Sequence, residues 1–165
     1  MAQPRLDREA VAGCYSCEHN AQASLRPHEH IYDDGLWRVA HSFNSAWLGW
    51  LVLVLRRHAQ SLGELTVAEA DAFGRLVPAV SRALEDELDV PKAYVLFLAE
   101  QEGFDHVHVH VIARPPEYAR GIRVFDLLKR PSDEWVTALE MDRLAARIAP
   151  RIVLMHGGPG PPTPG

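Results

Sequence analysis

The chain has 165 residues, of which 47% are hydrophobic and 24% are charged, an ordinary composition for one globular domain. This composition excludes a mostly disordered or collagen-like chain. The 17 Lys and Arg residues and 22 Asp and Glu residues give a net charge of -5, which argues against a broad basic surface for duplex nucleic acid. A small phosphate-bearing ligand is still compatible, because it needs only local donors.

Neither a membrane-spanning segment nor a secretory segment is visible in the sequence. The longest apolar run, Trp47–Leu55, is about nine residues, well short of the roughly 20 that cross a bilayer. No positively charged N-terminus leads into an apolar stretch, and two cysteines cannot build a disulfide framework. We therefore expect a cytoplasmic protein with no membrane partner.

The first third of the chain predicts short strands separated by turns. Residues 1–13 resemble a loose N-terminal arm, and residues 14–20 a compact polar knot. Ile31 and Tyr32 begin a short strand before a turn, and residues 36–42 lie around a second strand. The run Trp50–Leu55 is almost uniformly apolar, which predicts a strand buried on both faces and hence central or covered by a helix.

A long helix is the clearest element of the middle of the chain. Thr66 followed by Glu69 forms a capping box, and apolar residues at helical spacing follow it. The helix is predicted over residues 67–88, with Pro78 tolerated as a kink.

Two strands and a last helix are predicted in the remaining part. The strands cover residues 93–99 and 106–113, and the helix runs from Asp133 to about Ile148. Ser132 is expected to cap this helix and Pro150 to stop it.

These elements indicate one α+β domain with ragged ends. The domain is expected over residues 14–150, after a flexible arm at 1–13. The Gly/Pro-rich tail, residues 151–165, is expected to be disordered because it cannot bury apolar surface.

The segment His106-Val107-His108-Val109-His110-Val111-Ile112 alternates strictly between histidine and apolar residues. In a strand, all three imidazoles then share one face. Chance polar residues on a solvated face are one explanation. Joint ligation of one metal is a second, although alternate side chains on a flat strand diverge. In the third, one histidine is a nucleophile, and its neighbours position it or the leaving group.

The sequence Cys14-Tyr15-Ser16-Cys17 has the C-x-x-C spacing that suits zinc. A redox pair is an alternative, although no predicted strand precedes the motif and no predicted helix follows it. Two unremarkable thiols are another. Zinc needs two more ligands, for which the local candidates are His19, His28 and His30.

The heptapeptide at 106–112 resembles the His-φ-His-φ-His-φ-φ motif of the histidine triad superfamily, where φ is apolar. The similarity extends over about residues 14–114. It implies a histidine triad-like α+β fold with an antiparallel sheet of about five strands, one long helix and a C-terminal helix. The flanking matches are Trp37-Arg38-Val39, Gly49-Trp50-Leu51-Val52, Arg57-His58 and the helix at 65–88.

The resemblance implies nucleotide binding and attack on the α-phosphorus. His108 would be the nucleophile that forms a nucleotidyl-histidine, which water then hydrolyses, and His110 would hydrogen-bond the phosphate or the leaving group. Ser42 stands where the family commonly places a ribose-binding Asn or Asp, and Asn44 lies close enough to replace it. Gln101 would replace part of a phosphate-binding stretch that this chain lacks.

In the zinc-bearing branches of the family, a C-x-x-C is completed by two distant histidines. Carried over, Cys14, Cys17, His58 and His106 would hold a structural zinc ion. The other N-terminal histidines are then expected to be exposed polar residues: His19, His28 and His30. His41 either lines the pocket or faces solvent.

Three functions follow from the residues and the resemblance. The first is a hydrolase of the zinc-bearing dinucleoside polyphosphate branch, acting on a substrate like diadenosine tetraphosphate or on a nucleoside phosphoramidate. The second is a nucleotidyltransferase with the same intermediate, and the third is a nucleotide-binding module with little turnover. A pure zinc scaffold is a weaker fourth. The family often dimerises, which implies a homodimer through the long helix and the following strand.

The chain also departs from the family pattern. It has Leu48-Gly49-Trp50 where members often have Pro-Gly-His. Glu100 and Glu102 beside a phosphate pocket would repel an anionic substrate unless they turn away or pair with Arg114. The tryptophans are expected in the core or at an interface rather than stacked on a base: Trp37, Trp47, Trp50 and Trp135.

Overall fold

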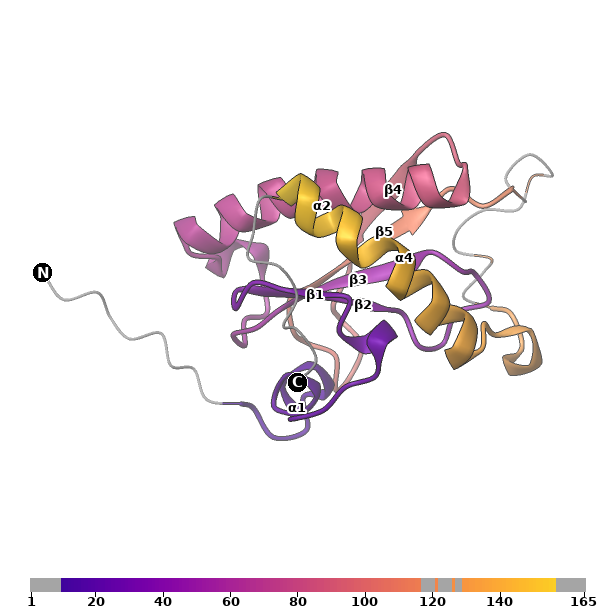
Figure 1. Ribbon diagram of the computed structural model, residues 1–165. Helices are drawn as coiled ribbons and strands as arrows, with labels where there is room; N and C mark the ends of the chain where they lie inside the picture. Colours follow the sequence, from indigo (N-terminus) through magenta and orange to yellow (C-terminus); the bar gives the residue numbers. More distant parts are fainter. Residues whose placement is uncertain (1–9, 117–120, 122–125, 127–128, 157–165) are drawn as a thin grey trace, which may run out of the picture.

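The computed structural model describes residues 10–116, 121, 126 and 129–156. Its centre is a five-stranded antiparallel sheet in the order β1-β2-β3-β5-β4 (Figure 1). The predicted α+β class and antiparallel sheet are confirmed. The strands are β1 (Tyr32–Asp33), β2 (Trp37–His41), β3 (Trp50–Leu55), β4 (Ala93–Phe97) and β5 (His108–Ala113). The described helices are α1 (Tyr15–Asn20), α2 (Val67–Leu88) and α4 (Ala138–His156), with 3-10 turns η1 (Pro27–Glu29), η2 (Leu62–Glu64) and η4 (Ser132–Glu134).

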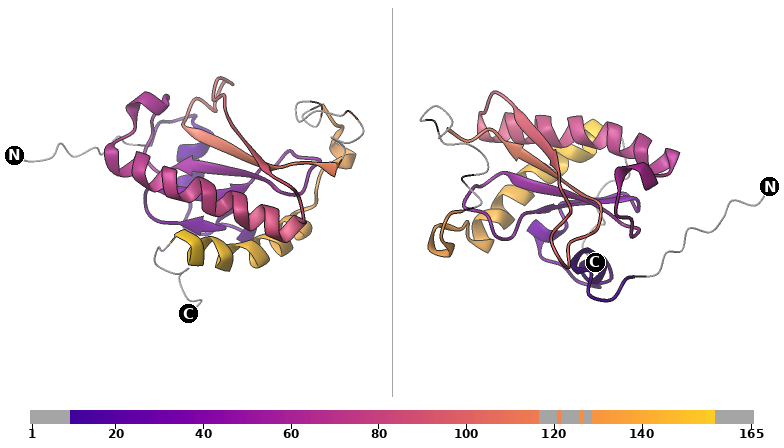
Figure 2. Two further views of the ribbon diagram at one scale, coloured as in Figure 1. Left: turned by 90° about the horizontal axis from the view of Figure 1, so that it is seen from above. Right: turned by 180° about the vertical axis from the view of Figure 1, so that it is seen from behind.

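The two faces of the sheet have different neighbours. Helices α2 and α4 lie side by side on one face, whereas α1 lies on the other side (Figures 1 and 2). Val39, Leu53 and Val109 pair in register and belong to the core that the two long helices cover. The neighbouring row, Arg38, Val54 and His108, therefore points to the α1 side, because side chains alternate along each strand.

The predicted central strand and long helix are confirmed. Strand β3 lies between β2 and β5 and is mostly buried. Helix α2 begins after Thr66, whose hydroxyl accepts a 3.2 Å hydrogen bond from the Glu69 N–H, while the Glu69 carboxylate accepts one of 2.8 Å from the Thr66 N–H. Pro78 is tolerated inside the helix on its exposed face.

The predicted C-terminal helix is wrong at both ends. Ser132 begins only the turn η4, and α4 starts after Thr137, which forms a capping box with Glu140. Pro150 lies inside α4 rather than ending it. Ile148 and Ile152 are fully buried on either side of it, and their burial offsets the hydrogen bond that proline removes.

The ends of three other segments also differ from the prediction. The expected polar knot at 14–20 contains helix α1, and β4 ends at Phe97. Strand β5 begins at His108, so His106 precedes the strand. The tail boundary predicted at residue 151 is wrong, because α4 continues to His156 and Ile152 is fully buried. Residues 1–9 and 157–165 lie outside the described residues, and the N-terminal arm stays a prediction. Across the part of the chain that the structure describes, no helix combines the length and apolarity that a membrane crossing requires.

Gly49 allows the close approach of α2 to the start of β3. Its φ is +99°, and a Cβ atom there would overlap Leu88 Cδ1 and lie 3.3 Å from Ala113 Cβ.

We expect Gly49→Ala to lower the free energy of unfolding by about 2–4 kcal/mol, through both backbone strain and overpacking. Gly35 is the control, because its φ is +83° but a Cβ atom there would have no neighbour within 4 Å. Gly35→Ala should cost about 1 kcal/mol in the same denaturant titration; equal losses would contradict the packing role.

Candidate functional site

A cavity of about 580 Å³ lies on the α1 side of the sheet. Its floor comes from the strands and includes Val52, His108 and His110. Its wall comes from α1 and η1, which contribute Tyr15 and His28 among others. Because elements from distant parts of the chain meet here, the cavity exists only in the folded protein.

His108 is the first of two adjacent imidazoles in the cavity. Its Nδ1 lies 2.7 Å from the backbone carbonyl oxygen of His106. A carbonyl only accepts, so the proton of the neutral ring is on Nδ1 and the lone pair is on Nε2. Burial lowers the pKa of His108 below its usual value, which keeps the ring neutral at physiological pH. The ring therefore has the protonation state of a nitrogen nucleophile.

His110 lies beside it, with ring centroids 5.1 Å apart and ring planes at 81°. Burial, followed by the influence of His108, lowers the pKa of His110 to about 4. The pair is thus uncharged near neutral pH, and neither ring repels the other electrostatically.

The residues predicted to bind a nucleotide line the same cavity. Ser42, Asn44 and Gln101 all contribute to its surface together with His108 and His110. Glu100 also lines it, on an exposed stretch of chain, whereas Glu102 does not.

Three aromatic side chains at the cavity were not predicted. The ring centroid of Tyr15 lies 5.0 Å from that of Phe43 and 5.0 Å from that of Phe104. Tyr15 also stacks on His19 at 4.2 Å. These rings come from α1 and two loops far apart in the sequence, so no local pattern indicates that they meet.

His41 lines the cavity but is already satisfied by the backbone. Its Nδ1 donates to the Ser42 carbonyl at 2.8 Å, and its Nε2 accepts from the Gly49 N–H at 3.1 Å. Burial lowers the pKa of His41 to about 4. The sequence left open whether His41 lines the pocket or faces solvent. The residue is 3% exposed and contributes to the cavity surface, so it lines the pocket.

The expectation that His28 is exposed is wrong. This residue is 6% exposed, and its Nδ1 lies 2.6 Å from a carboxylate oxygen of Asp142 on α4. Arg26 donates to the other Asp142 oxygen at 2.7 Å. Asp142 lies 114 residues further along the chain, so no nearby residue indicates the pairing. His19 and His30, also expected to be exposed, are partly buried.

A buried cation ties the cavity wall to the sheet. Arg38 on β2 is 3% exposed and donates to the Asn20 side-chain oxygen at 3.0 Å and to the Glu29 carbonyl. Burial lowers the pKa of its guanidinium. Arg38 thereby connects α1 and η1 to β2.

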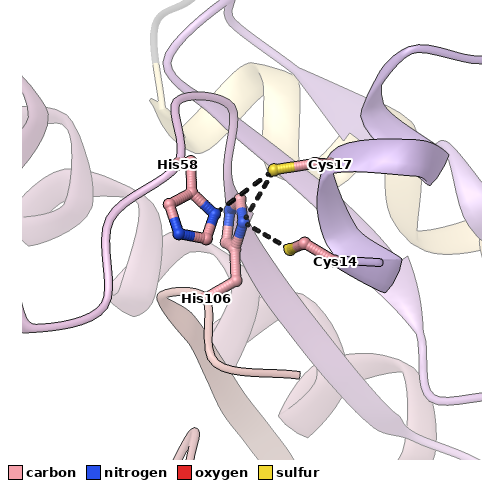
Figure 3. A group of neighbouring side chains, drawn as sticks. All are labelled: Cys14, Cys17, His58 and His106. Carbon is pink, nitrogen blue, oxygen red and sulfur yellow. Dashed lines mark hydrogen bonds between the residues drawn. The ribbon is translucent and has the colours of Figure 1, made fainter. Parts of the chain in front are cut away.

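The two cysteines and two histidines meet in a cluster beside the cavity (Figure 3). The Sγ atoms of Cys14 and Cys17 lie 3.4 and 3.5 Å from His106 Nδ1, and Cys17 Sγ lies 3.3 Å from His58 Nδ1. All four ligand atoms lie within 4.8 Å of one another. Cys14, Cys17 and His106 are buried.

The chemistry of this cluster fits zinc. Tetrahedral zinc with Zn–S of about 2.3 Å and Zn–N of about 2.0 Å requires S···N separations of roughly 3.5 Å, as observed. His106 Nε2 donates to the Leu55 carbonyl at 2.8 Å, so its Nδ1 offers a lone pair to the metal. The four residues fit a structural zinc site. The fully buried His106 turns to the cysteines and away from the cavity, so the three triad histidines do not share one site.

Comparison with known proteins agrees with this architecture. No protein-family model and no curated protein sequence matches the chain. Among solved structures, a histidine triad protein from Bradyrhizobium japonicum superposes with a TM-score of 0.62 at 24% identity, over 74% of this chain and 89% of that one. The chain has the histidine triad fold.

Two further structures share the histidine triad fold. A zinc-bound histidine triad family protein from Mycobacterium smegmatis has a TM-score of 0.61 at 15% identity, covering 87% of this chain and 96% of that one. A hypothetical histidine triad nucleotide-binding protein from Sulfolobus tokodaii has a TM-score of 0.59 at 18% identity, covering 83% and 91%. The fold implied by the sequence motif is therefore confirmed.

The zinc site predicts a metal content that depends on distant histidines. Purified protein should contain about one zinc ion per chain. His58→Ala should lose most of it and lower the free energy of unfolding, because metal binding is coupled to folding. Elemental analysis and thermal denaturation with and without a chelator measure both effects. His30→Ala is the matched control and should retain zinc; loss of zinc in His30→Ala but not in His58→Ala would favour the local ligand set.

The His28–Asp142 pair predicts a pH-dependent contribution to stability. Hydrogen bonds from Arg26 and His28 overcome partial burial and lower the pKa of Asp142 from 3.8 to about 2. Because the pKa of Asp142 is lower in the folded state than in the unfolded chain, its carboxylate stabilises the folded state above about pH 4. This contribution is lost as the pH falls towards 2. Asp142→Asn should cost about 1–2 kcal/mol at pH 7 and remove this acid dependence. The exposed Asp133→Asn serves as control in denaturant titrations from about pH 2 to 7; equal acid dependence in Asp142→Asn and wild type would contradict the assignment.

Proposed function

We propose that this protein is a nucleotide hydrolase that cleaves its substrate at the α-phosphorus through a nucleotidyl-histidine intermediate. The observation that supports it most directly is the state of His108, a neutral imidazole whose Nδ1 proton is bound by the His106 carbonyl. Its Nε2 lone pair is therefore available in a cavity large enough for a nucleotide.

In the first step, the lone pair of His108 Nε2 forms a bond to the α-phosphorus. The bond from phosphorus to the leaving group breaks, and its electron pair departs with that group. A polyphosphate leaves as an anion, whereas the nitrogen of a phosphoramidate takes a proton from solvent and leaves as a neutral amine. The ring becomes cationic, and the hydrogen bond from Nδ1–H to the His106 carbonyl stabilises that charge. His110 donates a hydrogen bond to the phosphate or the leaving group and keeps its proton.

In the second step, water attacks the same phosphorus. The N–P bond breaks, its electrons return to His108 Nε2, and the water proton is released to solvent. The product is a nucleoside monophosphate, and the enzyme regains its starting state. An acceptor other than water at this step would make the protein a nucleotidyltransferase.

The cavity also supports a substrate with a nucleoside end. Tyr15, Phe43 and Phe104 offer flat apolar surfaces, which suit stacking with a base. Ser42 and Asn44 supply polar groups for the ribose, and Gln101 supplies one for a phosphate. The substrate class we propose is a dinucleoside polyphosphate or a nucleoside phosphoramidate.

The dimer and the location in the cell belong to the same proposal. Strand β4 forms one edge of the sheet; Val95 within it and Leu98 directly after it are 46% and 54% exposed. We propose a homodimer through β4 and α2, in keeping with the family resemblance. The free cysteines Cys14 and Cys17 suit a reducing cytoplasm.

The decisive experiment is intact-protein mass spectrometry after mixing with AMP phosphoramidate or diadenosine tetraphosphate and quenching at alkaline pH. Wild-type protein and the control His30→Ala should show an AMP-sized adduct, and His108→Ala should show none. Product formation by His108→Ala should fall by at least about 10³-fold, as expected when a nucleophile is removed.

The other outcomes separate the alternatives. An adduct that accumulates after a burst and turns over slowly supports the binding module. An adduct that a second nucleophile discharges faster than water supports the transferase. A fully active His108→Ala would contradict the proposed nucleophile.

A further inference from the structure

Trp50 makes the one hydrogen bond to the His110 ring that the structure assigns among the described residues. The indole Nε1 lies 2.9 Å from His110 Nδ1, and the two rings are nearly perpendicular, at 86°. An indole N–H can only donate. His110 Nδ1 must therefore accept, and the proton of the neutral His110 ring must be on Nε2.

The surroundings leave His110 little choice of another polar partner. Its cross-strand neighbours are Val52 on β3 and Leu96 on β4, and both are apolar. The ring is partly buried and lines the cavity. With Nδ1 bound to Trp50, Nε2 is the ring nitrogen left for a ligand.

The indole itself is held firmly. Trp50 is 3% exposed and packs in a small apolar cluster with Ile112, Trp47, Tyr94 and Leu96. A buried, packed indole rotates little, so the direction of its N–H is fixed before any ligand arrives.

His108 and His110 then carry their protons on different nitrogens. The His106 carbonyl fixes the proton of His108 on Nδ1, whereas the Trp50 indole fixes that of His110 on Nε2. One ring thus offers a lone pair at Nε2, and the other offers an N–H at Nε2. We propose that Trp50 is a positioning residue that holds His110 as the hydrogen-bond donor to the phosphate or leaving group; this rests on the proposed function.

Loss of the indole N–H should allow the opposite tautomer. Without that donor, the His110 proton can move to Nδ1, and Nε2 then presents a lone pair that repels phosphate oxygens. Trp50→Phe removes the N–H and keeps an aromatic ring in the cluster. Trp47→Phe is the matched control, because it makes the same change in the same cluster but removes a 2.9 Å bond to the Ala113 carbonyl.

The primary measurement is ¹⁵N NMR of the histidine side chains in the metal-loaded protein, with His110 assigned by comparison with His110→Gln. In wild type, we expect bare Nδ1 and protonated Nε2 for His110. In Trp50→Phe we expect a mixture of tautomers, and in Trp47→Phe the wild-type pattern. Protonated Nδ1 in wild type, or an unchanged pattern in Trp50→Phe, would overturn the inference.

Kinetics supply the second measurement, with folding of each variant checked by circular dichroism. Trp50→Phe should lower kcat by roughly 10-fold with a smaller change in KM, the size expected for one hydrogen bond. Trp47→Phe should change kcat less than about twofold. Should Trp50→Phe fail to fold, the wild-type spectrum still decides the tautomer. The predicted tautomer in a protein without any hydrolytic or adduct-forming activity would contradict the proposed function and leave the indole–imidazole assignment standing.

Discussion

The side chain of His106 connects the parts of this molecule that build the cavity. Its Nε2 donates to the Leu55 carbonyl at the end of β3, and its Nδ1 faces the thiols of Cys14 and Cys17 at α1. Its backbone carbonyl accepts a hydrogen bond from the protonated Nδ1 of His108. His106 thus attaches the N-terminal helix to the sheet, together with Arg38, and sets the tautomer of its neighbour His108. Helix α1 is too short to be stable by itself, so the position of Tyr15 depends on this attachment.

The cavity separates three histidines that look equivalent in the sequence. His106 is fully buried at the cysteine cluster, whereas His108 and His110 line the cavity. A carbonyl acceptor beside one ring and an indole donor beside the other give the two neutral imidazoles opposite polarity at Nε2. Phosphoryl transfer needs both kinds of group, a lone pair for phosphorus and a donor for the developing charge on oxygen.

Local signals predicted most of the fold. The capping box at Thr66 and Glu69 and the apolar run Trp50–Leu55 marked α2 and β3 at the bounds observed. Alternation marked β5 but placed its start two residues early, at His106, where the cluster with the cysteines turns the side chain away. Pro150 suggested a helix end that tertiary burial of Ile148 and Ile152 overrides. The helix propensity of a residue is a local quantity. Packing overrides it wherever apolar burial contributes a few kcal/mol.

The sequence by itself determined the chemistry-bearing residues: the alternating histidines, the C-x-x-C motif and, through resemblance, the partners His58 and His106. Spacing and residue type suffice for the alternating histidines and for the cysteine pair, because a strand period and a C-x-x-C pattern are written into adjacent positions. The distant partners His58 and His106 follow only from the resemblance. Only the tertiary structure decided what surrounds them. The pairing of His28 with Asp142, the meeting of Tyr15, Phe43 and Phe104, and the bond from Trp50 to His110 all join separate segments. Such contacts arise when the packed core brings distant segments together, and no local rule encodes them.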